Sequence, residues 1–496
     1  MKKVIYSIFF TLAVFITSCN LPNNVDPKHA ETIAADPVFT YALSELANQV
    51  GSINVNINTT RLLAQYQAEV TYPTESRYNF SDRQIPDAFF TRIYQHVLMN
   101  LKAASATIES TVTATTEAEK MKTNKLAIIE VCNVYAYQIL VDAFGNVPYT
   151  EALMGRANST PKYDDAYTIY LDLIARLDAA MANMDADYDS FGDADVMYGG
   201  DVALWKEFAA SLELRMALRL ADVPAANPSA IVTKALAAGV FESQDESAIF
   251  KYTGVSPYVN SYYTEYVINA RKDFNPTVTL VDLMNGLNDP RRPIWFTLYD
   301  DGTNPPYYKG ETYGMSAAAT YKNYSHFSTM MRLDPKYPVI LSDYVEVEFL
   351  LAEACERSLG GKTPAEAELH YDNAINASML YWGVTQAQAD VYLGQPSVAY
   401  TTAAGGWKQK IGTQKWLGLF DRGEEGWAEW RRLDYPEFNP PVGMTYTDIP
   451  LRMPYPYNEN KQNKDNYTAA VAAMGGDEVD IPLFWDKVAS PFINVK

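Results

Sequence analysis

Apolar residues recur at helical spacing along most of the chain, in segments separated by glycine, proline and polar stretches. In segment 88–108 they fall three or four residues apart and therefore lie on one face of a helix. Segment 125–144 is apolar on nearly every side, which is typical of a buried helix. The one-sided pattern returns in segments 164–184, 203–220, 344–359 and 363–382. The hydrophobic pattern therefore predicts a mostly helical protein.

The predicted helices come in pairs joined by loops. The last of them opens with Thr363-Pro364-Ala365-Glu366, which supplies a cap, a proline in the first turn and an acidic start. Pairs of this kind stack into arrays, although no strict repeat period is present in this chain. We expect tetratricopeptide-like stacked helical hairpins joined by long irregular loops.

Segment 413–436 combines three tryptophans with a dense cluster of opposite charges. Its apolar residues keep helical spacing on both sides of Gly423, which predicts two helices that share one apolar face. Glu429 and Arg432 lie three residues apart, a spacing at which a salt bridge can form on a helix. We expect Trp427 and Trp430 to pack in the core, and the alternative is a platform for a ligand.

The chain is acidic, with a formal net charge of -20 over 496 residues. This charge argues against binding to nucleic acid or to an anionic membrane surface, and no cluster of Arg and Lys offsets it. Tyrosine is abundant, with 36 residues. Tyrosine and asparagine offer stacking faces and hydrogen bonds to neutral polar ligands, so the composition suits sugars or peptides better than nucleotides.

The amino terminus has the features of an export signal. Lys2 and Lys3 precede an apolar run at 4–16 that is too short to span a bilayer as a mature helix. The run ends in Ile-Thr-Ser-Cys, which resembles a lipobox and predicts acylation of Cys19; an ordinary secretory signal is the alternative. We expect a lipoprotein signal peptide at 1–18, a lipid anchor and tether at 19–30, and a single binding domain at 31–496.

The remaining cysteines and the acidic residues form no recognisable metal or redox motif. Cys132 and Cys355 lie within apolar helical patterns and are expected to be buried thiols, with a single disulfide as the alternative. The acidic stretch 185–195 resembles a calcium loop, but Ser190 and Val196 stand where an EF-hand has glycine and a bidentate glutamate. We expect a solvated acidic turn there, and neither a metal nor a cofactor.

Several motifs match one family in order along the chain. The segment 414–436 contains QKWLGLF, an acidic turn, EGWAEWRR and YP, and segment 142–149 reads DAFGNVPY. Segment 197–219 has the family's Tyr, Gly-Asp, Trp, Phe and Ser-Leu-x-Leu-Arg positions, with Ala210 where the family commonly has Asn. Further matches lie at 289–291, 346–354, 377–379 and 449–456. Together they resemble the SusD/RagB family of nutrient-binding lipoproteins from Bacteroidetes outer membranes.

The resemblance implies a function in nutrient uptake. It implies a surface-exposed outer-membrane lipoprotein that binds an oligosaccharide and delivers it to a SusC-like TonB-dependent transporter, over which it closes as a lid. The RagB branch of the family makes an oligopeptide ligand the first alternative.

Three aromatic-rich irregular segments are the expected ligand-binding loops: the first loop (65–83), the second loop (252–271) and the third loop (295–327). Aromatic faces pack on the C–H faces of sugars, while Asn and Arg donate to hydroxyls. We expect one shallow site formed by Tyr72, Arg77, Tyr78, Tyr258, Asn260, Tyr262, Tyr263, Tyr313 and Tyr324.

Sequence signatures of enzymes are missing. The chain has no nucleophile elbow, phosphate-binding loop, zinc-protease or dinucleotide motif. Glu346 and Glu348 are only two residues apart, which puts them on different faces of a predicted helix. We expect a binding protein without catalytic residues, and a secreted glycan hydrolase is the alternative from another class.

Overall fold

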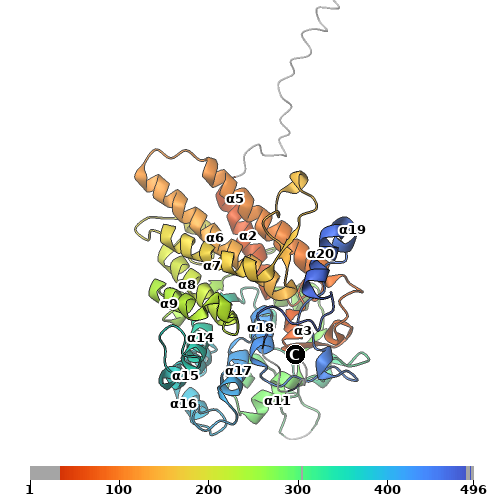
Figure 1. Cartoon of the computed structure of the whole chain (residues 1–496). Helices are drawn as coiled ribbons and strands as arrows, with labels where there is room; N and C mark the ends of the chain where they lie inside the picture. Colours follow the sequence, from red (N-terminus) through yellow and green to blue (C-terminus); the bar gives the residue numbers. More distant parts are fainter. Residues whose placement is uncertain (1–33, 303–304, 488–491, 493–496) are drawn as a thin grey trace, which may run out of the picture.

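Paired helices stack along one side of the molecule, and irregular segments cover the other side (Figure 1). The computed structural model describes residues 34–302, 305–487 and 492. The longer helices are α2 (Ala35–Gly51), α5 (Met99–Ser110), α6 (Thr116–Phe144), α7 (Ala166–Asn183), α8 (Val202–Arg219), α9 (Pro228–Ala238), α14 (Tyr344–Glu356), α15 (Ala367–Tyr381), α17 (Trp407–Gly418), α18 (Gly423–Leu433) and α20 (Lys464–Met474). The shorter ones are α3 (Thr60–Leu63), α4 (Ile85–Thr91), α10 (Ser261–Tyr263), α11 (Val278–Gly286), α12 (Arg292–Trp295), α13 (Thr329–Leu333), α16 (Gln386–Leu393) and α19 (Glu459–Gln462).

Strands contribute only three short antiparallel pairs to the described part of the chain. They are β1 (Gln67–Glu69) with β5 (Phe274–Pro276), β2 (Val147–Pro148) with β3 (Tyr163–Asp164), and β4 (Ala248–Phe250) with β6 (Val339–Ser342). In the first pair Ala68 lies opposite Asn275. The first and third of these pairs join segments that are far apart in sequence.

The helical hairpins predicted from the sequence are present. Neighbouring helices pack as α6 on α7, α8 on α9 and α14 on α15, and Figure 1 shows these pairs following one another along the left of the view. The mostly helical, tetratricopeptide-like fold is thus confirmed. The capping box of Thr363 and Glu366 is also present, on the 3-10 turn that precedes α15.

The buried helix α6 begins earlier than the hydrophobic pattern predicted. Its polar first turns start at Thr116, because the Thr115 hydroxyl accepts a hydrogen bond from the Ala118 N–H at 3.1 Å. It ends at Phe144 and is followed by Gly145, whose φ of 85° lies in the region that favours glycine. Among the described residues α6 alone has the length and composition of a membrane span, and most of it is buried inside the protein. It is therefore a core helix.

The segment around Gly423 forms α17 and α18, as predicted. Trp416, Trp427 and Trp430 are buried, so the core interpretation of these side chains is confirmed. The turn between the helices brings α18 against α3, where a Cβ on Gly423 would lie 2.5 Å from the Arg61 backbone nitrogen. Only glycine permits this approach.

Charged side chains of α18 lie inside the protein and pair with other helices. Glu429 accepts hydrogen bonds from Lys415 at 2.6 Å and from Arg432 at 2.5 Å. Glu425 accepts one from Arg219 of α8 at 2.6 Å. The predicted contact of Glu429 with Arg432 is therefore one part of a larger buried ion network.

The two buried thiols and the acidic stretch 185–195 take part in packing and in hydrogen bonds within the protein. Cys132 and Cys355 are free and buried, as expected for inert thiols, and burial raises the pKa of the Cys355 thiol to about 11. In the acidic stretch, Asp195 accepts hydrogen bonds from backbone N–H groups and from the Trp205 indole, while Asp185 pairs with Lys120 at 2.9 Å. The described residues contain no group of three or more potential metal ligands. The signal peptide, Cys19 and the tether lie outside the described residues.

Candidate ligand-binding face

The first, second and third loops meet at one place, which we call the loop junction. The pair of β1 with β5 joins the first loop to the segment that directly follows the second, and the Val70 N–H donates to the Asp273 carbonyl at 2.7 Å. The Ala319 N–H of the third loop donates to the Val70 carbonyl, also at 2.7 Å. The expectation that these loops lie together is therefore correct at the level of the backbone.

Two buried carboxyl groups lie at the loop junction. Burial raises the pKa of Glu69 to about 9, with a further contribution from the charge of Glu75, and burial raises that of Glu311 to about 8. Both groups are therefore protonated at neutral pH. The junction carries less negative charge than its sequence suggests, which suits a neutral ligand.

Four of the nine predicted site residues are buried and hold the loops in place. The Tyr313 hydroxyl donates to the Leu62 carbonyl at 2.7 Å, and the Tyr78 ring lies 6.1 Å from the Tyr313 ring. The Tyr262 hydroxyl donates to the Asp421 carboxylate at 2.6 Å. The Asn260 side chain accepts from the Tyr263 N–H at 2.9 Å and so caps α10. These contacts give the four side chains structural roles.

The other five predicted residues reach the surface. Tyr72 and Tyr258 are 54% and 55% exposed, and Tyr263 and Tyr324 are partly exposed. Within the described part of the chain, no hydrogen bond engages the hydroxyls of these four tyrosines. Arg77 differs, because its guanidinium donates to two backbone carbonyls, those of Gly314 at 2.8 Å and Val442 at 2.7 Å.

The nine side chains do not form one cluster. Only two of their rings contact each other in the described structure, those of the buried pair Tyr78 and Tyr313. The expected convergence on one site is thus limited to the backbone of the loops. A tyrosine-rich loop must bury some of its rings to hold its own shape, and the sequence does not distinguish those rings from the exposed ones.

A compact aromatic group on the third loop includes Tyr324, and the predicted set missed its other members. We call Tyr299, Tyr307 and Tyr324 the tyrosine platform. The Lys309 ammonium lies 4.6 Å from the Tyr299 ring centre and 5.2 Å from that of Tyr324, while Tyr299 and Tyr307 pack edge to face at 5.6 Å. The sequence signal was the turn dipeptide Asp301-Gly302, which predicts a hairpin that pairs Tyr299 with Tyr307.

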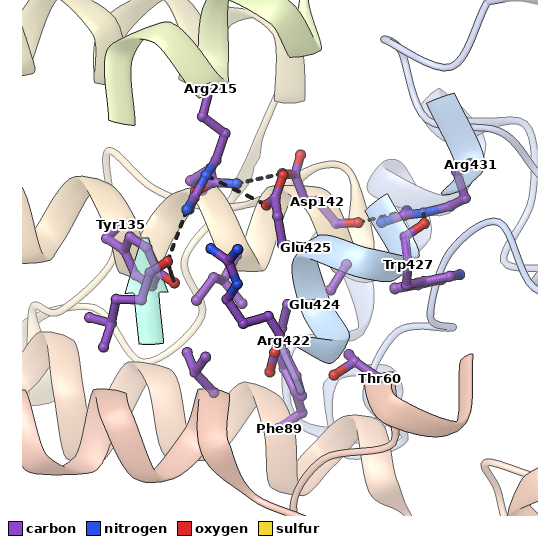
Figure 2. A pocket seen from close by; sticks show the side chains of 15 residues that line it. Thr60, Phe89, Tyr135, Asp142, Arg215, Arg422, Glu424, Glu425, Trp427 and Arg431 are labelled. Atoms are coloured by element: carbon purple, nitrogen blue, oxygen red, sulfur yellow. Dashed lines mark hydrogen bonds and ion pairs between the residues drawn. The ribbon is translucent and has the colours of Figure 1, made fainter. Parts of the chain in front are cut away.

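The buried ion network surrounds a cavity that is too small for a sugar. Figure 2 shows the guanidinium groups of Arg215 and Arg422 facing the same space as Glu425. The cavity volume is about 20 Å³, room for a single water molecule. Glu346 beside it pairs with both arginines, and Glu348 instead accepts a hydrogen bond from His370 at 2.8 Å. These carboxylates stabilise the fold and do not face a ligand cleft.

Comparison with known proteins agrees with the motifs. The sequence profile of the SusD-like family, described as starch-binding and associating with the outer membrane, matches residues 27–456. No curated protein matches the chain. A solved structure named a chitin-binding protein has a TM-score of 0.77 and 24% identity, and the match covers 92% of this chain and 100% of that one.

Other solved structures share the fold at similar identity. A SusD homolog from Bacteroides uniformis has a TM-score of 0.75 and 24% identity, covering 91% of this chain and 99% of that one. A chitin-binding SusD homolog from Flavobacterium johnsoniae has a TM-score of 0.73 and 23% identity, with the same two coverages. Because the family profile spans most of the sequence, this chain belongs to the SusD-like family.

Proposed function

We propose that this protein is a lipid-anchored, non-catalytic binding protein of the outer membrane that captures an oligosaccharide and delivers it to a SusC-like TonB-dependent transporter. Residues 31–496 act as a single binding domain. The family's description as starch-binding and outer-membrane-associated supports this function, and two solved relatives are named for chitin binding. Co-purification of a TonB-dependent transporter from detergent-solubilised outer membranes tests the partnership.

The tyrosine platform beside the loop junction is the observation that supports a sugar as the ligand. Its rings are at least partly exposed and can stack on sugar C–H faces. The Tyr307 hydroxyl donates to the Asp301 carboxylate at 2.9 Å, while no hydrogen bond between described residues engages the hydroxyls of Tyr299 and Tyr324, which can bind sugar hydroxyls. The protonated carboxyls of Glu69 and Glu311 leave the junction without their negative charges. We therefore propose that the platform, the exposed tyrosines Tyr72 and Tyr258 and the partly exposed Tyr263 bind a neutral glycan.

The proposed mechanism is capture and release. A glycosidase needs two carboxylates that face one cleft, and the carboxylates of the buried ion network are instead paired with arginines around a cavity of about 20 Å³. Incubation of the purified protein with neutral glycans should release no products. Appearance of shorter sugars would favour a hydrolase.

Replacing Tyr324 with alanine should weaken glycan binding while leaving the fold intact. Shallow sugar sites bind at micromolar concentrations or weaker, about -5 to -8 kcal/mol, and loss of one stacking ring costs about 1 to 2 kcal/mol. Calorimetry with malto-oligosaccharides, chitin oligosaccharides and mixed oligopeptides measures the effect. Tyr324→Phe should keep most of the affinity, since the ring remains.

The matched control is Tyr41→Ala. Tyr41 is an exposed tyrosine on α2, on the helical array, and its hydroxyl lies 3.0 Å from the His96 ring nitrogen. This variant should bind as the unaltered protein does. Equal affinity in Tyr324→Ala and Tyr41→Ala would contradict the platform, and binding of peptides without binding of glycans would move the ligand to the RagB type.

Replacing Cys19 with alanine should release the protein from the membrane fraction. Acylation of Cys19 is the proposed attachment, and a folded body with an excess of acidic residues has little affinity for anionic lipids by itself. Fractionation of cells that produce the variant measures the effect. Cys355→Ala is the matched control, because this buried thiol carries no anchor, and retention of Cys19→Ala in the membrane would count against the anchor.

A further inference from the structure

A hollow of about 450 Å³ lies outside both the loop junction and the tyrosine platform. One wall comes from the end of the first loop and the start of α4, the other from the C-terminal segment that contains α19 and α20, at the right of Figure 1. Its volume falls in the range of small-molecule sites, roughly 300 to 1,000 Å³. We call it the α19 hollow, and its lining includes Phe80, Gln84, Tyr455, Tyr457, Asn460 and Tyr467.

We infer that the α19 hollow is a second saccharide subsite, which takes a short uncharged sugar chain. This inference rests on the proposed function, since it assumes that the protein binds glycans. Tyr457 is 53% exposed at the hollow, although the Lys461 ammonium lies 4.1 Å from its ring centre. An aromatic ring with this exposure offers the apolar surface on which a sugar ring stacks.

Two side-chain amides in the lining are free to bind hydroxyl groups. Gln84 and Asn460 are exposed, and no hydrogen bond between described residues engages either amide. Each amide has two N–H donors and one carbonyl acceptor, and a sugar hydroxyl uses both kinds of partner. Aromatic surface and free amides therefore occur together in one concave site.

The carboxylates of the lining define the charge of the ligand. Asp87 accepts the N–H groups of Tyr457 at 2.8 Å and of Asn458 at 2.9 Å, so it shapes the wall of the hollow. Asp477 accepts the Tyr455 N–H at 2.8 Å and the Tyr467 hydroxyl at 3.0 Å. Asp477 also pairs with the Arg452 guanidinium at 3.1 Å, whereas Asp87 has no cationic partner among the described residues. The uncompensated Asp87 carboxylate repels an anionic sugar. The subsite should therefore bind neutral sugars and reject uronic acids or sulfated sugars.

The first loop connects the α19 hollow to the ligand-binding face. Arg83 lies 5.4 Å from the Tyr72 ring centre and 2.7 Å from the Glu75 carboxylate, and the next residue, Gln84, lines the hollow. The two surfaces are therefore adjacent along the chain while they use different side chains. Substitutions can address each one separately.

The test compares Tyr457→Ala and Asn460→Ala with Gln462→Ala, an exposed neighbour on α19 outside the lining. The probes are chitotriose and maltotriose, with a trigalacturonate as the anionic probe, and calorimetry gives the affinities. The measurement is made in the Tyr324→Ala background, so that the platform contributes less to binding. We expect both hollow variants to bind a neutral probe about 5- to 10-fold more weakly. Gln462→Ala should leave the affinity unchanged, and the trigalacturonate should not bind.

A second readout localises the sugar. Hydroxyl-radical labelling of Tyr457 should fall when the bound probe is present, while labelling of Tyr41 should not change. Unchanged affinity and labelling in the presence of a bound neutral probe would overturn the subsite and leave the platform standing. If the hollow variants weaken binding of the neutral probe and Tyr324→Ala does not, the platform is overturned and the subsite stands. No binding of any neutral sugar would overturn both.

Discussion

Replacing Trp427 with alanine is expected to lower the free energy of unfolding by about 3 to 5 kcal/mol. Trp427 is 1% exposed, its indole N–H donates to the Pro450 carbonyl at 2.9 Å, and the Arg431 guanidinium lies 3.6 Å from its ring centre. The substitution leaves a void in the core and removes a hydrogen-bond donor from a buried carbonyl. Chemical denaturation followed by circular dichroism measures the change.

The matched control is Trp407→Ala, at the exposed start of α17. Trp407 is partly exposed and packs beside the Arg357 guanidinium, so its loss should cost much less than that of Trp427. The folded fraction of Trp427→Ala should keep its affinity for the glycan. A variant that kept its stability and lost its ligand would restore the alternative interpretation of these tryptophans as a ligand platform.

Replacing Glu353 with glutamine should cost up to about 3 to 5 kcal/mol, because Arg432 and Arg357 each lose one of their two carboxylate partners and keep only Glu429 and Asp222. Glu353 is fully buried on α14, where it pairs with Arg432 of α18 and accepts a hydrogen bond from Arg357 at 2.6 Å. Glutamine has nearly the same shape but no charge. The loss of stability therefore reports the ion pairs rather than the packing.

The difference in unfolding free energy between wild type and Glu353→Gln should also depend on pH. Burial alone would raise the pKa of Glu353, but the charges of Arg432 and Arg357 outweigh burial and hold it at about 2. In the unfolded chain the pKa of a glutamate lies in the ordinary range of about 4 to 5. The contribution of Glu353 is therefore present above that range and is lost as the pH falls towards about 2.

Denaturation at pH 7 and at pH 3 measures this dependence, and the free-energy difference between wild type and Glu353→Gln should be smaller at pH 3. Glu109→Gln, on the exposed end of α5, is the matched control and should change stability little at either pH. Equal stability of wild type and Glu353→Gln at pH 7 would show that the ion pairs of Glu353 contribute nothing to the stability of the fold.

The helices were predictable from the sequence because their signals are local. The periodicity of 88–108 and the glycine after α6 depend on residues within a few turns of each other. The π-helical turn at Arg92–Leu98 inside the first of these helices was not predicted, because apolar spacing alone does not reveal one extra residue in a turn. The buried ion network also escaped prediction, apart from Glu429 with Arg432, since most of its other pairs join segments that are distant in sequence, such as Arg219 with Glu425.

The candidate site was predictable only as a set of loops. Tyr262 and Tyr263 are neighbours in sequence, yet the first is buried against Asp421 and the second is partly exposed. Which of two adjacent tyrosines faces water depends on Asp421 in the turn between α17 and α18, more than 150 positions later in the chain. The composition of a loop indicates the ligand chemistry, and tertiary packing selects the side chains that can reach the ligand.

The close contact of α18 with α3 bears on the order in which the protein can fold. Several partners of residues near position 60 lie beyond position 415: the Tyr66 hydroxyl donates to the Trp416 carbonyl at 2.7 Å, and the Trp416 indole donates to the Ala64 carbonyl at 3.0 Å. Contacts of such high sequence separation form late and slowly. A nascent chain therefore lacks these contacts at the base of its first loop until synthesis has passed α18, and a truncation before Trp416 should make that loop more accessible to proteases even where the earlier helical hairpins are complete.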